Sequence, residues 1–365
     1  MKIQCNSEKL KNALAHAERM TGKNLTLPIL SSILCIASEK SLKLRATNLS
    51  LGIEIEIPAK IEKEGVVAVS GALLSGFFAN SKSGEEVFIE QVGETLHIKS
   101  KQAKGQIKTF PYEDFPTIPS VESDVLKIPA IALLEGLNAT SYACAQTDIK
   151  PEIASVSVYA EEDVLVFAAT DSFRLAEKKI KVKGLYGFQS VLIPQKNTVE
   201  IVRVLGSASG DISVKISKNL IAFSFDGYYV TSRVVDGAFP DYRRIIPKEK
   251  NTEAILLKAE LQNALKTSTL FTDKFNQVTL SFDPAKKKSV LYAKNTEVGE
   301  NETDLDAALT GGPISVVINY RYLNDCLGAI PSDSIAFEFA SESKPILVKG
   351  VGDQSFLYLI MPMNR

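Results

Sequence analysis

An acid, a hydroxyl and a guanidinium stand within four consecutive positions near the middle of the chain. Asp171, Ser172 and Arg174 come one residue after the apolar run VLVFAA, which ends at Ala169 and is typical of a buried strand. An enzyme that uses these three side chains is one hypothesis, and it requires that activity be lost on Ser172→Ala. A serine nucleophile needs a base beside it, however, and no histidine is near in the sequence. The alternative is a turn, in which the Asp side chain accepts hydrogen bonds from backbone N–H groups.

Other motifs of catalysis or metal binding are missing. The chain has no GxxxxGK[ST] or GxGxxG loop for phosphates and no GxSxG motif. The two histidines, His16 and His97, have no histidine or cysteine partner two to four residues on, so we expect solvated surface positions for both, with no metal and no cofactor. These patterns favour a binding protein over an enzyme.

The composition indicates a folded protein, and the net charge predicts no particular class of binding partner. Of 365 residues, 45% are hydrophobic and 23% are charged, which allows two or three domains with buried cores. The net charge is −1, so any nucleic-acid surface must be local. Four dispersed cysteines without a CxxC pair, and no apolar run of about 20 residues, predict a cytoplasmic protein that does not cross a membrane.

A sequence repeat runs through the chain and changes the interpretation of the cluster of Asp171, Ser172 and Arg174. Asn48, Asp171 and Asn295 each follow a β-rich run and lie 123 and 124 positions apart, and the Phe-Pro pairs at 115 and 239 lie 124 apart. The chain length is close to three such intervals, which predicts three similar units. Because asparagine cannot act as a general base, the repeated Asn or Asp favours a turn at Asp171 over catalysis.

Each unit is expected to contain a strand, a helix, several strands, a second, shorter helix and further strands. Apolar periodicity predicts first helices over 9–20, 130–144 and 259–270, and second helices over 71–79, 197–205 and 320–329. Alternation such as LGIEIEI predicts half-buried sheets. The expected fold class is α+β, in three tandem domains over 1–120, 121–247 and 248–365.

Basic side chains recur along these helices and just beyond them: Lys9, Arg19, Lys23, Lys82, Lys196, Arg203, Lys266 and Arg321. If all six helices faced one way, these side chains would form a track that binds phosphates without reading sequence. Acidic residues are interleaved with them, so an ordinary solvated helix surface is the alternative.

Two runs of opposite charge occur in the first and the third of these units. Lys99, Lys101 and Lys104 lie near the end of the first unit, and Glu297, Glu300 and Glu302 lie in the third. Charged edge strands often only prevent unwanted pairing. Opposite signs would also suit a head-to-tail contact between two copies, which makes a ring if it closes.

Four motifs, in order, resemble the bacterial DNA polymerase III β sliding-clamp family along the whole chain. They are TLPIL at 26–30, ATDxxRLA at 169–176, VDGxFPDYRR at 235–244 and MPM at 361–363. The resemblance implies three copies of one clamp domain, each with two helices packed on antiparallel sheets. It also implies a head-to-tail homodimeric ring that encircles double-stranded DNA and tethers the polymerase, with no catalysis of its own.

The resemblance also implies a pocket for short peptides of the polymerase III α subunit, the clamp loader, and other polymerases and repair proteins. Its residues would be Ile153, Thr170, Ser172, Phe173, Arg174, Leu175, Pro240, Arg244, Ile245, Phe275, Asn319, Tyr322, Ser343, Pro345, Leu359, Ile360, Met361, Pro362 and Met363. Lys150 would be a further DNA-facing residue, and Ile107 would meet Leu270 and Phe271 at the dimer joint. Many members carry Gly-His at Ser172-Phe173, so an altered peptide preference, or a clamp-like paralogue with other partners, is a further hypothesis.

Overall fold

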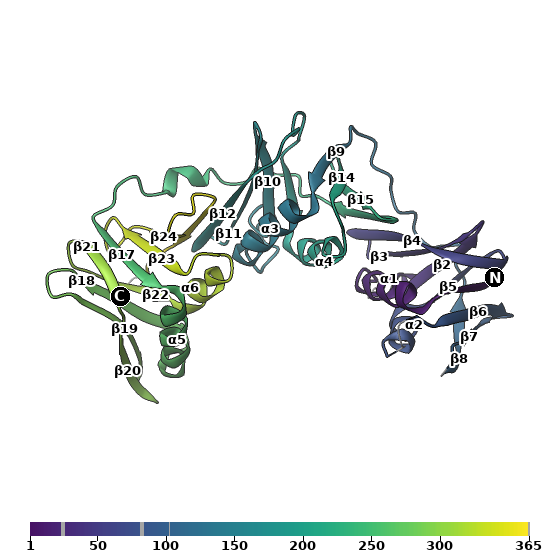
Figure 1. Ribbon diagram of the computed structural model, residues 1–365, viewed down its shortest axis with the longest axis horizontal. Coiled ribbons are helices and arrows are strands. Elements are labelled where there is room, and N and C mark those ends of the chain that lie inside the picture. Colours follow the sequence, from purple (N-terminus) through teal and green to yellow (C-terminus); the bar gives the residue numbers. More distant parts are fainter. Residues whose placement is uncertain (23–25, 81–83, 102, 364–365) are drawn as a thin grey trace. The chain divides into compact units, whose positions relative to one another are not determined.

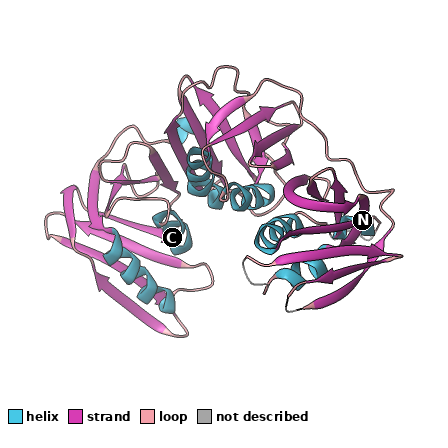
Figure 2. Cartoon of the chain, turned by 45° about the vertical axis from the view of Figure 1, so that its right-hand side comes forward, coloured by secondary structure: helices cyan, strands magenta, loops and turns pink. Residues whose placement is uncertain are grey.

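The computed structural model describes residues 1–22, 26–80, 84–101 and 103–363, so the predicted DNA-facing residues Lys23 and Lys82 lie outside the described residues. The chain divides into two compact units, Met1–Leu134 with Lys196–Val234, and Glu135–Gln195 with Val235–Arg365. Each unit is built mainly of antiparallel strands with helices against them (Figures 1 and 2). The middle third of the chain contributes to both units.

The first unit contains one continuous antiparallel sheet. In spatial order its strands are β1 (Lys2–Asn6), β6 (Glu86–Val92), β7 (Thr95–Lys99), β8 (Lys104–Phe110), β5 (Gly65–Ser70), β2 (Ser32–Ser38), β3 (Ser41–Thr47), β4 (Leu51–Lys63), β16 (Tyr228–Arg233), β15 (Leu220–Phe225), β14 (Asp211–Ile216) and β9 (Leu126–Pro129). The far half of β4 also pairs with β1, so the pairing of the first eight strands closes on itself. Ile53, Ile55 and Ile57 alternate inward along β4, which fixes its register.

Helices α1 (Ser7–Arg19) and α2 (Gly71–Phe78) pack against each other and against this sheet (Figure 1). Asn6 starts α1, because its side chain accepts hydrogen bonds from the N–H groups of Glu8 and Lys9. Leu10 and Leu14 form its buried stripe. The boundaries agree with the predicted helices to within two residues.

The prediction that His16 is a solvated residue of α1 is wrong. Its ring is half-buried and its Nδ1 lies 3.3 Å from the hydroxyl of Tyr228, with the two rings edge to face. Burial, and then the nearby Arg19 charge, lower the pKa of His16. The sequence could not show this contact, since the two residues are 212 positions apart.

The second unit contains two antiparallel sheets. The larger has the order β13 (Val191–Pro194), β10 (Ser155–Glu161), β11 (Val164–Thr170), β12 (Arg174–Lys181), β25 (Phe356–Ile360), β24 (Ile346–Gly350), β23 (Ser334–Phe339), β17 (Thr252–Leu257) and β21 (Ala307–Gly311). The smaller has the order β20 (Gly299–Asp304), β19 (Lys288–Asn295), β18 (Gln277–Asp283) and β22 (Ile314–Asn319). Pairing of β12 with β25 brings Arg174 opposite Ile360 and thereby joins the central cluster to the C-terminal segment.

Four further helices complete the six α-helices of the described residues. They are α3 (Ala130–Thr140) and α4 (Gln195–Leu205), whose residues are divided between the two units, and α5 (Lys258–Ser268) and α6 (Tyr320–Leu327) in the second unit. Two predicted helices end earlier than expected and continue as 3-10 turns, η2 (Ser141–Ala143) and η4 (Thr269–Phe271). Among the described residues, no helix combines the length and the apolarity that a membrane crossing needs.

The predicted repeat recurs in the hydrogen bonds at the strand ends. The side chain of Asn48 accepts from the N–H of Leu51, 2.8 Å away, and that of Asp171 accepts from the N–H of Arg174, 3.0 Å away. Asn295 accepts from the N–H of Glu297, two residues on, as Asn48 and Asp171 also do from Ser50 and Phe173. The turn interpretation of these residues is therefore confirmed.

Candidate functional site

The turn between β11 and β12 is held by its own side chains. Thr170 Oγ1 donates to the carbonyl of Arg174 at 2.6 Å and accepts from the N–H of Ser172 at 3.1 Å. Asp171 Oδ1 accepts from the N–H of Phe173, and its Oδ2 accepts from the Arg174 side chain. Ser172 adopts the left-handed φ of 78°, which is uncommon for a residue with a side chain. Both carboxylate oxygens of Asp171 thus accept hydrogen bonds, one from the backbone of the turn and one from Arg174. The enzyme hypothesis therefore lacks a free base beside Ser172.

The guanidinium of Arg174 is bound entirely inside the second unit. It donates to Asp171, to Asp325 of α6 at 2.6 Å and to the carbonyl of Tyr142 at 2.6 Å. It also lies 4.8 Å from the ring centre of Tyr322. Burial acts to lower the pKa of Arg174, but its phenolic and carboxylate neighbours outweigh burial and hold that pKa above its ordinary value. The side chain of Arg174 is only 8% exposed. It therefore has a structural role here and does not present a free positive charge to a ligand.

The C-terminal segment is fixed beside this turn. Met361 N–H donates to the carbonyl of Phe173 at 2.8 Å, and Met363 N–H donates to the carbonyl of Val317 at 2.8 Å. Leu359 is buried next to Leu175. The thioether of Met361 therefore lies on a fixed backbone, and it can adapt to varied apolar groups.

The FPDYRR segment forms the opposite wall. Tyr242 is buried, and its hydroxyl donates to Glu177 and lies 2.7 Å from the hydroxyl of Tyr159. Burial, and then the bond to Glu177, raise the pKa of Tyr242 well above its ordinary value. The edge of the Phe239 ring packs on Tyr242. This network joins the segment to β10 and β12.

These walls enclose a cavity of about 160 Å³, which we call the apolar cavity. It is lined by Ile153, Thr170, Ser172, Arg174, Leu175, Pro240, Asp241, Tyr242, Ile245, Leu359 and Met361. All but Asp241 and Tyr242 were expected from the sequence. Asp241 and Tyr242 lie between the predicted residues Pro240 and Arg244 in the same motif. Their position in that motif could have identified them as further lining residues.

A second cavity of about 560 Å³, which we call the basic cavity, adjoins the first. Five of its lining residues were predicted for the peptide pocket: Arg244, Ile245, Ser343, Pro345 and Met361. The others come from the linker before β17 and the turn between β23 and β24: Ile246, Pro247, Lys248, Glu249, Ala340 and Lys344. Ile245 and Met361 line both cavities, so the two adjoin at these side chains, and we call the two cavities together the groove.

The remaining predicted pocket residues line neither cavity: Phe173, Phe275, Asn319, Tyr322, Ile360, Pro362 and Met363. Phe173 is 60% exposed at the rim, and Phe275 is also exposed. Asn319 caps α6 by accepting from the N–H of Arg321 at 3.0 Å. Ile360 is buried in the sheet. Of these residues, Phe173 and Ile360 adjoin the apolar cavity through their backbones, because the carbonyl of Phe173 accepts from the N–H of Met361 and Ile360 pairs with Arg174.

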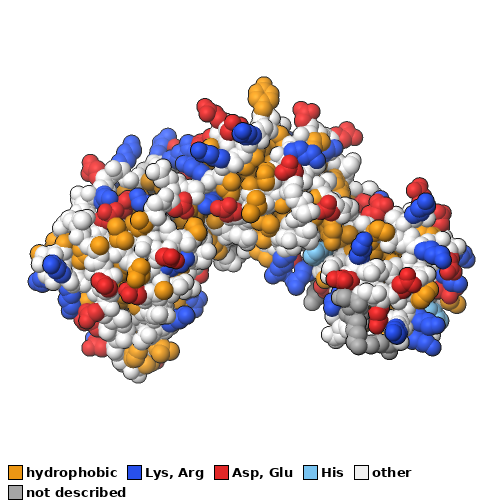
Figure 3. All heavy atoms as spheres, in the orientation of Figure 1, with side chains coloured by type: hydrophobic (Ala, Val, Ile, Leu, Met, Phe, Trp, Pro, Cys, Tyr) orange, Lys and Arg blue, Asp and Glu red, His pale blue; other side chains and the backbone are white. Residues whose placement is uncertain are grey.

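The predicted DNA-facing residues that the structure describes are exposed and occur in both units: Lys9, Arg19, Lys150, Lys196, Arg203, Lys266 and Arg321. Arg203 forms an ion pair with Glu200 at 2.9 Å. Acidic and basic side chains are interspersed over the visible face of each unit (Figure 3). No group of three or more metal-ligating side chains occurs among the described residues.

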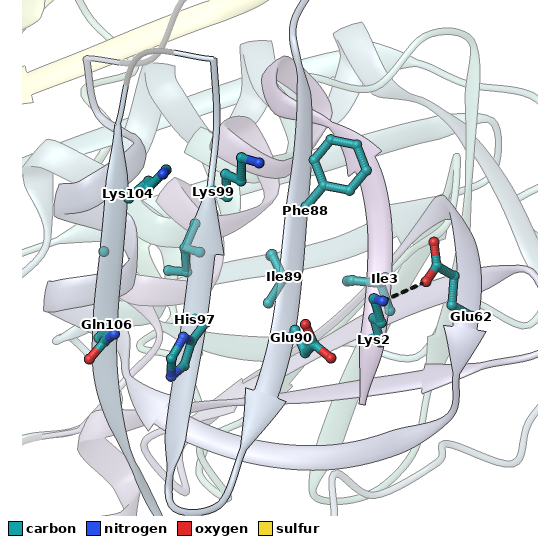
Figure 4. Close-up of a pocket in the computed structure, with 12 residues that line it drawn as sticks. Lys2, Ile3, Glu62, Phe88, Ile89, Glu90, His97, Lys99, Lys104 and Gln106 are labelled. Atoms are coloured by element: carbon teal, nitrogen blue, oxygen red, sulfur yellow. Dashed lines mark ion pairs between the residues drawn. The ribbon is translucent and has the colours of Figure 1, made fainter.

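Of the predicted dimer residues in the first unit, Lys99 and Lys104 lie on one exposed sheet face, Lys101 lies in the loop between their strands, and Ile107 is buried on the other face of β8. Lys99 and Lys104 are directly opposite each other on β7 and β8, and the exposed Phe88 is beside them (Figure 4). Lys2 pairs with Glu62 at 3.0 Å across the same face. A cavity of about 540 Å³ lies over this face, which we call the sheet-face cavity.

The other predicted dimer residues differ in accessibility. Ile107 is only 8% exposed, so it offers little surface to a second copy, whereas Leu270 is 70% exposed. Lys101, Phe271 and Glu297 also keep exposed or half-exposed side chains. Within the second unit, Glu300 accepts from the hydroxyl of Tyr292 and Glu302 pairs with Lys288 at 3.1 Å. The acidic run is therefore partly compensated within its own sheet.

Comparison with known proteins agrees with these features. Three models of the DNA polymerase III beta subunit match in succession: the N-terminal domain at residues 1–119, the central domain at 127–241 and the C-terminal domain at 243–364. The chain belongs to the DNA polymerase III beta subunit family. The predicted α+β fold of three tandem clamp domains is confirmed.

Relatives and solved structures of this family are similar over their whole length. The beta sliding clamp of Synechococcus elongatus is 27% identical over 100% of this chain and 99% of its own. The crystal structure of the beta sliding clamp from C. crescentus is 26% identical, with a TM-score of 0.92 and coverage of 100% of this chain and 99% of that one. The Thermotoga maritima beta subunit, at 23% identity, has the same fold, with a TM-score of 0.94 over 100% and 99% of the two chains.

Proposed function

We propose that the protein is a DNA sliding clamp, a scaffold without catalysis of its own that tethers the replicative polymerase to duplex DNA. Membership of the beta subunit family supports this, and so does a groove built from the motifs that the resemblance singled out. The engaged oxygens of Asp171 count against the enzyme alternative. The observation that carries the proposal is the apolar cavity between the 171–174 turn and the C-terminal segment.

The apolar cavity suits a short linear peptide. It offers apolar walls such as Leu175, Ile245 and Leu359, and nothing in it resembles a catalytic pair. Such pockets take apolar anchors, while backbone groups orient the peptide. We assign to it the peptides of the polymerase III α subunit, of the clamp loader and of other polymerases and repair proteins.

The proposed assembly is a head-to-tail homodimeric ring with double-stranded DNA in its hole. The exposed lysines and arginines of the helices would contact phosphates, which slide past because such contacts do not read sequence. The lysines at 99, 101 and 104 would face the acidic residues at 297, 300 and 302 of a second copy. A near-neutral net charge of −1 suits a protein that holds DNA by topology rather than by tight binding.

We further propose domain boundaries of 1–120, 121–247 and 248–365 and a cytoplasmic location at the nucleoid. The ranges that the three family models match support this division. The proposed partners require a compartment that contains replicating DNA.

A polymerase extension assay tests the proposed function. A primed single-stranded circle is copied by the replicative polymerase and clamp loader of the same cell, with and without this protein, under single-hit conditions. We expect products many times longer when the protein is present, and Ile245→Asp should abolish the increase. Product length independent of the protein would refute the tethering role.

A further inference from the structure

The first unit contains a cavity that is built on the same plan as the apolar cavity of the second unit. It has a volume of about 340 Å³ and lies between the turn that joins β3 to β4, the end of β16 and the linker at 116–119; we call it the repeat cavity. We propose that the repeat cavity is a second peptide site, in which Arg233 binds an acidic side chain of a linear peptide. This inference rests on the proposed peptide role of the apolar cavity and adds a site outside the groove.

The two cavities have the same turn at their rim. Thr47 Oγ1 donates to the carbonyl of Leu51 at 2.9 Å and accepts from the N–H of Leu49 at 3.0 Å. Thr170 makes the corresponding two bonds in the turn beside the apolar cavity. Leu49 and Ser172 occupy equivalent positions, and both adopt a left-handed φ, of 73° and 78°. Both rims therefore have a backbone that is already fixed when a ligand arrives, which lowers the entropic cost of binding.

The strand beside the turn is equivalent as well. The N–H of Arg233 in β16 donates to the carbonyl of Ser50 at 2.8 Å, as the N–H of Met361 donates to the carbonyl of Phe173. The proline of each repeated Phe-Pro pair lines the cavity of its own unit. The repeat therefore produces a second cavity of the same construction, in which Arg233 has the place of Met361.

The side chains on this shared frame differ, and they change the ligand that fits. Arg233 replaces the thioether of Met361, and Thr231, which pairs with β4 as Leu359 pairs with β12, replaces the aliphatic wall of Leu359. The repeat cavity is also wider than the apolar cavity, about 340 Å³ against about 160 Å³. It therefore suits a peptide that carries a polar or charged group at the place of an apolar anchor.

The guanidinium of Arg233 is held in place but is not neutralised. Its Nε donates to the carbonyl of Leu49 at 2.9 Å, and the residue is exposed. No carboxylate in the part of the chain that the structure describes forms an ion pair with it. A guanidinium binds a carboxylate through two parallel N–H groups. Charge complementarity therefore favours an Asp or Glu, next to an apolar residue that can contact the 43% exposed side chain of Leu49.

Fluorescence anisotropy with labelled ten-residue peptides tests this assignment. Each peptide carries one Leu and one Asp at a varied spacing in a background of Gly and Ser, and its C-terminus is amidated so that the Asp is its only carboxylate. A matched peptide carries Asn in place of Asp. We expect one spacing at which the Asp peptide binds about five-fold more tightly than its Asn counterpart at low salt. This gain should shrink as salt rises, because the contact with an exposed arginine is screened.

Three variants locate the carboxylate. Arg233→Gln should remove the gain from Asp. Leu49→Asp should remove it too, because it places a competing carboxylate beside Arg233, at a left-handed position that Asp tolerates. Arg203→Gln, at an exposed arginine of the same unit that does not line the repeat cavity, should preserve the gain.

Ile245→Asp separates the two peptide sites, because Ile245 lines the groove and not the repeat cavity. The gain from Asp should survive in this variant. If no spacing gains from Asp, if the gain persists in Arg233→Gln, or if it disappears in Ile245→Asp, the second site is wrong. Binding of neutral apolar peptides to the unchanged protein tests the proposed function separately, so a failure of the second site and a failure of the proposed function are distinguishable.

Discussion

The apolar cavity and the sheet-face cavity differ in volume and in the side chains that line them. The sheet-face cavity is larger, about 540 Å³ against about 160 Å³. Its polar side chains, however, project from regular strands towards solvent. The apolar cavity is walled by buried aliphatic and aromatic groups. We therefore place the proposed peptide site in the apolar cavity because of the kind of wall it has, and not because of its size.

The rims of the two cavities explain this difference. Around the apolar cavity, the turn at Asp171, the guanidinium of Arg174 and the hydroxyl of Tyr242 are all held by hydrogen bonds. A ligand there meets a shape that is already formed, which lowers the entropic cost of binding. On the sheet face, Lys99 and Lys104 oppose each other, a like-charge arrangement that destabilises an isolated sheet. That face gains from a partner that neutralises it, whereas the apolar cavity needs only an apolar anchor.

The largest effect is expected from Arg174→Met. It leaves Asp171 and Asp325 without their cation, and breaking a mostly buried charge pair on one side costs about 3 kcal/mol of unfolding free energy. Urea unfolding measures this loss. Lys2→Met breaks the exposed pair with Glu62 on the sheet face and should cost far less, because an ion pair in contact with solvent contributes little to stability. Equal losses of unfolding free energy in the two variants would show that the ion pairs beside the two cavities contribute equally to stability.

Ile245→Asp should have the next largest effect, on peptide affinity. The side chain is 48% exposed, so the variant should fold, but it places a charge on the wall that both groove cavities share. We expect binding of an apolar peptide to weaken about 30-fold, which corresponds to about 2 kcal/mol. Phe88→Asp makes the same kind of change in the sheet-face cavity and should leave that affinity unchanged. A loss in Phe88→Asp would move the peptide site to the sheet face.

Charge reversal at Lys99, Lys101 and Lys104 tests what the sheet face does instead. Replacing all three by Glu should shift sedimentation from dimer towards monomer, most strongly at low salt, because exposed charges are screened as salt rises. Peptide affinity should be retained. A dimer of unchanged stability would show that these lysines do not form ion pairs with a second copy.

The smallest effect concerns pH and lies away from both cavities. The pKa of His16 is lowered in the folded protein from 6.5, so the folded state binds fewer protons than the unfolded state. Its contribution to stability is therefore present above about pH 6.5 and is lost as the pH falls below that value. Thermal unfolding at pH 5 and 7.5 should show a smaller pH difference for His16→Gln than for the unchanged protein. An identical difference would mean that His16 does not titrate in this way.

Local chemistry could be predicted from the sequence, and distant contacts could not. The turn at Asp171 follows from hydrogen bonds within four residues and recurs at Asn48 and Asn295. The bond from Arg174 to Asp325 spans 151 positions, and no periodicity marks it. Arg174 lines the apolar cavity, where the resemblance predicts the peptide pocket, but only the structure shows that its charge is already satisfied.

The same limit applies to surfaces. Basic residues such as Lys9 and Arg321 are recognisable on predicted helices, and they are exposed as expected. Lys248 and Lys344 lie 96 positions apart in unremarkable linker and turn sequence, and only folding brings them to one cavity. Charge runs are visible in a sequence, whereas charge clusters formed by folding are not.

Retention on DNA tests the central claim most directly. The protein is loaded by the clamp loader onto a nicked circular plasmid, and the DNA is then separated from free protein by gel filtration, before or after one restriction cut. A sliding clamp should elute with the intact circle and be lost from the linear form, because it runs off the ends. Equal retention on both forms, or retention on neither, would contradict the account.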